Sequence, residues 1–218
     1  VVEGLPSYAD ENGMAATGPQ GVALRGLGNA YATIGLGANP EQRAELGPLG
    51  ENFARVIRFD VRTGAVAYVA DPGQFENDHD PDGGQGGMVD TNPYALLTLG
   101  GKSLAMTDAG GNALLLIDPQ TGGISLAAVF PTRTLDVPPG LPFPLPTKID
   151  AEFVPNALAR GPDGALYVGG LRGFPFTAAY GAAKHAMVGL TRALGAELAS
   201  TAIRVRALCP GFVDTEIT

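Results

Sequence analysis

The chain has 218 residues and a formal net charge of −8, with 22 acidic and 14 basic side chains. A hydrophobic fraction of 45 % argues against a disordered chain, and an acidic balance without any basic run disfavours binding to nucleic acid. No apolar stretch is long enough to span a bilayer, and the single cysteine, Cys209, cannot form an intrachain disulfide.

The first part of the chain, residues 1–176, has the composition of a turn-rich β structure. It carries 17 of the 18 prolines and most of the 32 glycines, and short apolar segments alternate with turn signals. Such punctuation favours many short strands over a helix bundle.

An internal repeat runs through this first part. The segment Asn92–Met106 can be laid over Asn156–Val168, and a weaker copy starts near Gly21. In each copy a short apolar strand is followed by a glycine-containing turn and a second apolar strand. The repeat therefore predicts a series of similar two-stranded units.

A second pattern predicts hairpins in the other half of each repeat. Arg55–Tyr68 resembles Ala113–Leu126, and in both an apolar strand ends at an aspartate that is followed by Thr-Gly. We expect Asp60 and Asp118 to cap these turns, and Gly64 and Gly122 to adopt positive φ.

Together the two patterns give four strands per unit, which is typical of a β-propeller blade. One whole blade is predicted from about Asn92 to Pro131, and another, with a long insertion, from about Gly18 to Pro72. A third begins at Asn156 with two strands. A closed propeller has about four blades or more, so we expect open sheet edges that favour self-association.

A possible metal site lies in the loop between the first two units. Asp78, Asp80 and Asp82 stand at alternate positions before Gly83, as at the start of a calcium-binding loop. The pattern then departs from that loop, because Val89 stands where a bidentate acid is needed and no flanking helix is evident. Both a Ca²⁺ site and a solvated acidic turn remain open.

A set of motifs in the first part carries a resemblance to a known family: Asp71–Gly84, Asp90–Tyr94, Thr107–Asp118, Gly161–Gly170 and Gly173–Phe176. On these motifs residues 1–176 resemble the ScyD/ScyE-type β-propeller family. The resemblance implies a secreted or periplasmic binding protein with an unidentified small-molecule ligand. It supplies no catalytic motif.

The last part, residues 177–218, reads differently. Residues 178–199 lack proline, are rich in Ala and Leu, and place apolar side chains at spacings of three and four, which predicts a helix. Residues 203–209 first alternate between apolar and polar side chains and then become wholly apolar before Pro210-Gly211. This pattern predicts a short strand ending in a loop.

This last part resembles the C-terminal YxxxK segment of the classical short-chain dehydrogenases/reductases. The motif residues are Tyr180 and Lys184 on the helix and Pro210-Gly211 after the strand. The resemblance implies that Tyr180 and Lys184 are catalytic, that Lys184 also binds the ribose of NAD(P), and that a loop contacts the cofactor. The cofactor-contacting loop residues are Pro210, Gly211, Val213 and Thr215.

The chemistry of the Tyr–Lys pair is clear from its spacing. Residues four apart share one face of a helix. A phenol has a pKa near 10, and a neighbouring ammonium group favours the phenolate and lowers that pKa. The tyrosine can then exchange a proton with a carbonyl or alcohol while hydride moves to or from a nicotinamide.

Other parts of a dehydrogenase are missing from the sequence. The family needs a glycine-rich strand–turn–helix for the pyrophosphate, and Thr17–Leu24 has the wrong spacing and is interrupted by Pro19. A catalytic serine about a dozen residues before Tyr180 is also absent. We therefore predict a non-catalytic β module without a cofactor. The alternative is an NAD(P)-dependent short-chain dehydrogenase/reductase that uses Tyr180 and Lys184.

The predicted fold is mainly β: incomplete propeller-like blades over residues 1–176, then a helix–strand segment of a Rossmann-type α/β fold over residues 177–218. The two resemblances together indicate a chimeric chain with its junction near residues 176/177. The propeller resemblance implies an exported protein and the dehydrogenase resemblance a cytoplasmic one, so the compartment is left open.

Overall fold

The computed structural model describes residues 2–9, 16–26, 28–84, 88–100, 103–136 and 146–170. The chain divides into two compact units, Val1–Arg172 and Gly173–Thr218, and the described residues all belong to the first unit. The predicted helix 178–199, the strand 203–209 and the junction near 176/177 lie outside the described residues.

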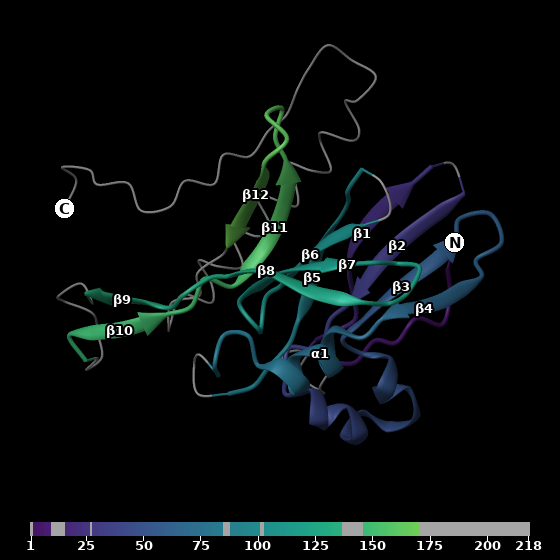
Figure 1. The fold of residues 1–218 in the computed structure, drawn as a ribbon. Coiled ribbons are helices and arrows are strands. Elements are labelled where there is room, and N and C mark those ends of the chain that lie inside the picture. Colours follow the sequence, from purple (N-terminus) through teal and green to yellow (C-terminus); the bar gives the residue numbers. More distant parts are fainter. Residues whose placement is uncertain are drawn as a thin grey trace, which may run out of the picture. The chain divides into compact units, whose positions relative to one another are not determined.

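The first four strands form an antiparallel meander, called sheet 1 (Figure 1). Its strands follow chain order: β1 (Pro19–Arg25), β2 (Asn29–Ile34), β3 (Arg55–Asp60) and β4 (Val66–Ala70). The predicted insertion between β2 and β3 holds a 3₁₀ segment, η1 (Pro40–Asn52).

The next four strands repeat this arrangement and are called sheet 2. They are β5 (Pro93–Thr98), β6 (Leu104–Asp108), β7 (Ala113–Ile117) and β8 (Ile124–Val129), again in chain order. A short helix, α1 (Pro72–His79), lies in the connection between the two sheets.

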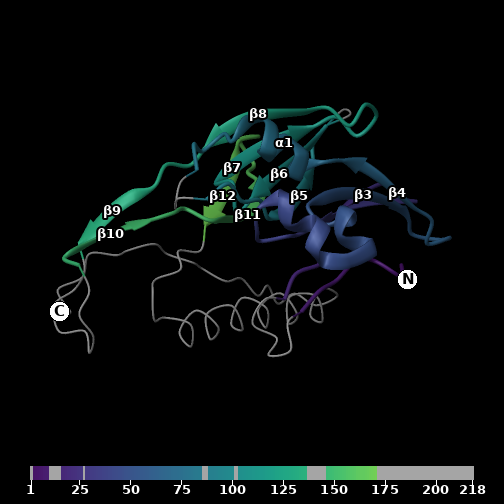
Figure 2. The same ribbon diagram turned by 90° about the horizontal axis from the view of Figure 1, so that it is seen from below.

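Two strand pairs complete the described structure. β9 (Arg133–Asp136) pairs with β10 (Lys148–Ala151), and β11 (Pro155–Arg160) pairs with β12 (Leu166–Gly170). The β9–β10 hairpin extends away from both four-stranded sheets in Figures 1 and 2. The β11–β12 pair occupies the predicted start of a third repeat.

The repeat is visible in the geometry as well as in the sequence. β1, β5 and β11 each begin with a proline, where a missing N–H costs no ladder bond. Each then has a register shift directly after that proline. In the first two repeats a threonine on the next strand accepts a hydrogen bond from the irregular segment: Thr33 from Gly21 N at 2.8 Å, and Thr107 from Ala95 N at 3.0 Å.

The two predicted aspartate turns are confirmed. Asp60 and Asp118 accept hydrogen bonds from main-chain N–H groups of their own turns, those of Arg62 and Gln120 at 2.8 Å. Gly64 and Gly122 have φ values of 74° and 77°, which is the left-handed region that favours glycine.

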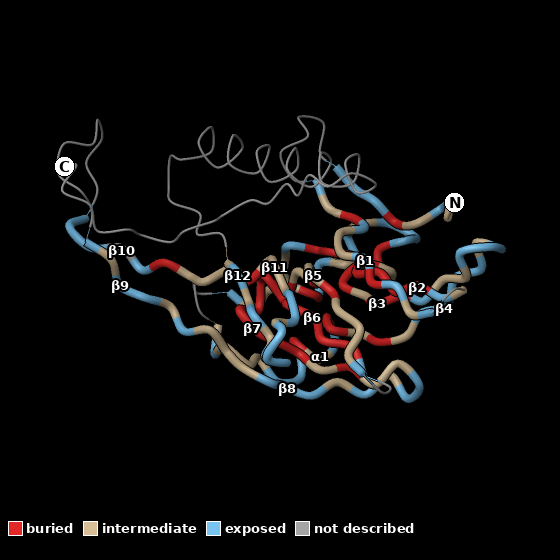
Figure 3. The backbone as a smooth tube through the Cα atoms, turned by 90° about the horizontal axis from the view of Figure 1, so that it is seen from above, coloured by how far each residue is buried: buried red, intermediate tan, exposed pale blue. Residues whose placement is uncertain are grey.

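The main core lies between sheet 1 and sheet 2, as the buried stretches in Figure 3 show. β2 is buried on both faces: Tyr31 faces sheet 2, whereas Ile34 belongs to a second apolar cluster on the other side of sheet 1. Phe53 and Leu36 contribute to that second cluster, and Leu46 of η1 covers it. Burial on both faces explains why β2 lacks simple polar–apolar alternation.

The first strands of the two sheets lie close together. The Thr33 hydroxyl donates to the Tyr94 carbonyl oxygen at 2.6 Å, and Gln20 Nε2 donates to Asn92 Oδ1 at 2.7 Å. A Cβ added at Gly21 would lie 2.2 Å from the Tyr94 carbonyl oxygen, so only glycine allows this approach. Strands β1 and β5 thus join the sheets side by side.

The structure confirms a mainly β fold of antiparallel sheets, with four strands in each of the first two units and two in the β11–β12 pair. The described strands do not form a closed ring, and their interpretation as propeller blades stays a prediction. The expectation that no helix flanks the acidic loop is wrong. Asp71 provides an N-cap whose side chain accepts from Gln74 N, and Pro72 follows it at the first helical position, so α1 begins directly before that loop.

Candidate functional site

The predicted catalytic and cofactor-binding residues lie outside the described part of the chain. They are Tyr180, Lys184, Pro210, Gly211, Val213 and Thr215. Their assignment therefore stays a prediction from the sequence.

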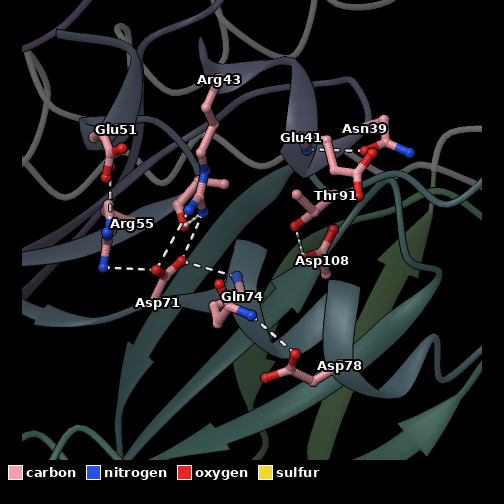
Figure 4. Close-up of polar contacts among 11 residues, drawn as sticks. Asn39, Glu41, Arg43, Glu51, Arg55, Asp71, Gln74, Asp78, Thr91 and Asp108 are labelled. Carbon is pink, nitrogen blue, oxygen red and sulfur yellow. Dashed lines mark hydrogen bonds and ion pairs between the residues drawn. The ribbon is translucent and has the colours of Figure 1, made fainter. Parts of the chain in front are cut away.

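The predicted metal loop is described, and the structure changes its membership. Asp78 lies on α1 and accepts a hydrogen bond from Gln74 Nε2 at 2.8 Å, in an exposed position (Figure 4). Asp80 and Asp82 instead come together with Glu76. Their carboxylate oxygens lie within 4.8 Å of one another, and we call these three residues the acidic cluster.

Helix geometry explains the exchange of Asp78 for Glu76. Residues four apart share a helical face, whereas residues two apart point to different sides. Asp80 is the C-cap of α1, and its main-chain N–H donates to the Glu76 carbonyl oxygen at 2.8 Å. Glu76 and Asp80 are therefore neighbours on one face, and Asp78 is directed elsewhere.

Main-chain and amide donors hold the two aspartates of the cluster. Gly84 N donates to Asp80 Oδ1 at 2.8 Å and to Asp82 Oδ1 at 3.0 Å. Asn112 Nδ2 donates to Asp82 Oδ2 at 2.9 Å, while its Oδ1 accepts from Val154 N at 3.1 Å. Asn112 thus connects the acidic loop to sheet 2 and to the segment before β11.

Glu76 is the least solvated member of the acidic cluster. Its side chain is 1 % exposed, and its Oε1 has no hydrogen-bond partner among the described residues. A Cβ added at Gly111 would lie 2.5 Å from Glu76 Oε2, so the glycine allows the chain to pass close to this carboxylate. Burial, and then the negative charges of Asp108, Asp82, Asp80 and Asp90, raise the pKa of Glu76 to about 8.

Asp108 lies behind the cluster at the end of β6. It is 1 % exposed and accepts from Thr91 Oγ1 at 2.5 Å (Figure 4). It also accepts from Asn92 N at 2.6 Å and from Gly110 N and Gly111 N at 3.1 Å. Burial raises the pKa of Asp108, although these hydrogen bonds oppose the rise. Burial and neighbouring carboxylates also raise the pKa of Asp90 to about 6.

The arginine side chains near α1 form ion pairs with a carboxylate outside the acidic cluster. Asp71 forms ion pairs with Arg43 Nη2 at 2.6 Å and Arg55 Nη1 at 2.7 Å (Figure 4). Among the described residues, neither Glu76 nor Asp108 has an ion-pair partner. Several carboxylates therefore surround Glu76, and among the described residues no basic side chain forms an ion pair with it.

A separate cavity of about 630 Å³ lies between sheet 1 and the turn that follows β7. Its lining includes Tyr31 and Tyr68, the basic side chains Arg25 and Arg58, and the turn 119–122.

Sequence reasoning found Asp80 and Asp82 but missed Glu76, Asp108 and Asn112. A signal for Glu76 was present, because Asp71-Pro72 is a typical helix start. On a helix that begins there, Glu76 and Asp80 are four residues apart and share one face. No comparable signal existed for Asp108 and Asn112, which only the pairing of β6 with β7 brings behind the loop.

Comparison with known proteins finds a similarity at the end of the chain. Residues 167–218 match the family described as short chain dehydrogenase. The first residues of this match lie in β12, ten residues before the junction expected from the sequence.

Individual relatives match the same end. A Streptomyces coelicolor protein that carries the name ketoacyl reductase is 57 % identical over 47 residues, covering 22 % of this chain and 18 % of the relative. A 3beta-hydroxysteroid dehydrogenase from Mediterraneibacter gnavus is 49 % identical over 51 residues, or 23 % and 18 %. A 3-oxoacyl-[acyl-carrier-protein] reductase from Chlamydia trachomatis is 47 % identical over 49 residues, or 22 % and 20 %.

These matches have a narrow extent. The chain spans about a fifth of the length of the curated relatives it matches. No solved structure gives a significant match. The comparisons give no support to the ScyD/ScyE resemblance of residues 1–176, which stays a prediction. Among the described residues, no helix is both long and apolar enough to cross a membrane.

Proposed function

We propose that the chain acts as an NAD(P)-dependent oxidoreductase of the short-chain dehydrogenase type, with its catalytic and cofactor-binding residues in the segment 177–218. The observation that carries this proposal is the match of residues 167–218 to that family, with 57 % identity to one relative over 47 residues. This support favours the dehydrogenase hypothesis over the non-catalytic module that the sequence first indicated.

Tyr180 is the proposed proton donor and acceptor. The spacing of four residues puts Lys184 on the same face of the predicted helix, where its ammonium group favours the phenolate and lowers the phenol pKa. Tyr180 can then give its proton to a carbonyl oxygen as that oxygen gains negative charge. The nicotinamide, when bound, supplies the hydride.

The remaining predicted residues position the cofactor. Lys184 is proposed to hold the ribose hydroxyls in addition to its effect on Tyr180. The loop after the predicted strand is proposed to contact the nicotinamide and phosphates through Pro210, Gly211, Val213 and Thr215. A glycine next to a cofactor allows close approach of the backbone, which fits Gly211 in this role.

The proposed substrate is a ketone or the corresponding secondary alcohol. Two of the relatives are named as reductases of ketoacyl or 3-oxoacyl groups and a third as a hydroxysteroid dehydrogenase. All three names describe interconversion of a carbonyl and an alcohol. A 3-oxoacyl thioester is therefore the first substrate to test.

Cofactor binding tests this proposal. The full chain is titrated with NADPH and with NADH while nicotinamide fluorescence is followed. Saturable binding is expected, and Lys184→Ala should weaken it about tenfold or more, because hydrogen bonds from a charged group are lost. Lys148→Ala, which removes an exposed ammonium group from β10, is the matched control and should bind like the unmodified chain. Absence of binding at millimolar cofactor would overturn the proposal.

A second candidate function is a non-catalytic binding module in residues 1–176, built from propeller-type blades. The repeated four-stranded sheets and the close approach of β1 to β5 favour it. The cavity lined by Arg58 and Tyr68 offers a place for a ligand. This hypothesis expects no nicotinamide binding, and it expects concentration-dependent self-association through open sheet edges, which light scattering measures.

A further inference from the structure

We propose that the acidic cluster of Glu76, Asp80 and Asp82 binds a hard divalent cation, with Ca²⁺ as the favoured ion. The three carboxylates approach from the end of α1 and the turn after it, and one oxygen of each lies within 4.8 Å of the others. A single cation in contact with three oxygens brings them to such separations, because Ca–O distances are about 2.3 to 2.6 Å.

The second and independent observation is the state of Glu76. A side chain that is 1 % exposed leaves Oε1 with no hydrogen-bond partner among the described residues. Buried polar atoms are nearly always satisfied, so an orphaned carboxylate oxygen indicates a missing partner. Since the same carboxylate belongs to the cluster, a cation held there supplies that partner.

The surrounding frame is already built for such an ion. Gly84 N donates to both aspartates, and Asn112 Nδ2 fixes the second oxygen of Asp82. These donors fix the orientation of the carboxylates without adding positive charge. Gly111 leaves room for the Glu76 carboxylate, because a Cβ there would collide with Oε2.

The donor set favours Ca²⁺ over transition metals. All three cluster members offer oxygen atoms, which suit hard cations. The nearby His79 is not part of the cluster: its Nδ1 lies 3.0 Å from the Phe75 carbonyl oxygen, and its ring stacks on Phe75. Ca²⁺ tolerates irregular coordination completed by water, whereas Mg²⁺ demands a near-octahedral shell.

An occupied site would link parts of the chain that are distant in sequence. Asn112 connects Asp82 to the Val154 N–H, so an ion on the cluster would strengthen the contact between the loop, sheet 2 and the segment before β11. Binding to the folded state alone raises stability. Ca²⁺ should therefore raise the thermal midpoint of the chain.

The test is calorimetric titration of the full, EDTA-treated chain with CaCl₂, and with MgCl₂ as a second arm. We expect one site with a Kd of about 0.1 to 1 mM for Ca²⁺, and weaker binding of Mg²⁺. Glu76→Gln and Asp82→Asn should each weaken Ca²⁺ binding about tenfold or more. Asp78→Asn is the matched control, since it removes an adjacent carboxylate that lies outside the cluster.

A thermal melt of each protein with and without Ca²⁺ gives the second readout, and circular dichroism reports its folding. Ca²⁺ should raise the midpoint of the unmodified chain and of Asp78→Asn by similar amounts, and that of Glu76→Gln by clearly less. No heat and no midpoint shift for the unmodified chain at about tenfold above that Kd range would overturn the proposal. Loss of binding in Asp78→Asn as large as in Glu76→Gln would also overturn it.

Discussion

The Thr33 hydroxyl on β2 donates a hydrogen bond to the Tyr94 carbonyl oxygen on β5 at 2.6 Å, and Thr33 Oγ1 also accepts a hydrogen bond from Gly21 N at 2.8 Å. One buried hydroxyl thus provides the hydrogen-bond acceptor for the main-chain N–H of Gly21 at the irregular start of sheet 1. The same hydroxyl links sheet 1 to sheet 2. Thr107 has the equivalent place in sheet 2 and accepts from Ala95 N. The two sheets therefore share this threonine hydrogen bond as well as their strand order.

Replacing Thr33 with valine should destabilise the first unit by about 1 to 3 kcal/mol, because two partly buried main-chain groups lose their partner. Thr107→Val should cost less, since one such bond is described for it. Thr98→Val, which removes an exposed bond to the Leu24 carbonyl oxygen, should stay within about 0.5 kcal/mol. Urea unfolding followed by circular dichroism measures the series, and equal losses in all three variants would contradict this ranking.

The Asp71 carboxylate combines a helix cap with two ion pairs (Figure 4). Asp71→Asn keeps an N-capping side chain but leaves the Arg43 guanidinium, 12 % exposed, without its counter-charge. We expect a loss of about 2 kcal/mol, and about 1 kcal/mol more for Asp71→Ala, which also removes the cap.

Asp136→Asn serves as the control for Asp71, because its pair with Lys148 is exposed on both sides. Surface pairs of that kind contribute about 0 to 1 kcal/mol. Chemical denaturation in low and high salt separates charge from capping. A loss in Asp71→Asn no larger than in Asp136→Asn would show that Arg43 does not need its partner.

The acidic cluster gives the metal-free protein a definite pH dependence. Burial raises the pKa of Glu76 from 4.5 to about 8, so the folded chain retains a proton that the unfolded chain loses near its ordinary pKa. Between these two values the folded state binds more protons, and stability must fall as pH rises. The slope for one proton is at most about 1.4 kcal/mol per pH unit.

Asp90 and Asp108 act in the same direction, because their pKa values are also raised. Urea unfolding in EDTA at several pH values from about 5 to 8 measures the effect. Glu76→Gln should flatten the profile, since glutamine does not titrate. A stability that increases with pH over this range in the unmodified chain would contradict the assignment.

The parts of the fold that the sequence predicted well are those fixed by local chemistry. Asp60 and Asp118 cap their turns with their own side chains, and Gly64 and Gly122 occupy a backbone region that few other residues enter. These interactions span a few residues, so their signatures are readable in one dimension. The strand order of sheet 2 then follows from its short hairpin connections, whereas in sheet 1 the connection from β2 to β3 is long and holds η1.

The parts that were missed depend on contacts between distant segments. The structure places Asp80 and Asp82 beside Glu76 and not beside Asp78, because alternate spacing assumes an extended loop, whereas α1 continues to His79. Asn112 reaches Asp82 from thirty positions away, and Asp108 is placed by strand pairing. The β9–β10 hairpin was also missed, since Arg133–Asp136 lacks the apolar alternation of a buried strand.

Reduction of a 3-oxoacyl thioester by NADPH, with the unmodified full chain and Tyr180→Phe compared side by side, tests the central proposal most directly. Phenylalanine keeps the ring and removes the hydroxyl that gives the proton. We predict NADPH oxidation that depends on the thioester and falls about 100-fold or more in Tyr180→Phe. An unchanged rate in Tyr180→Phe, or no NADPH oxidation by the unmodified chain, would contradict the account.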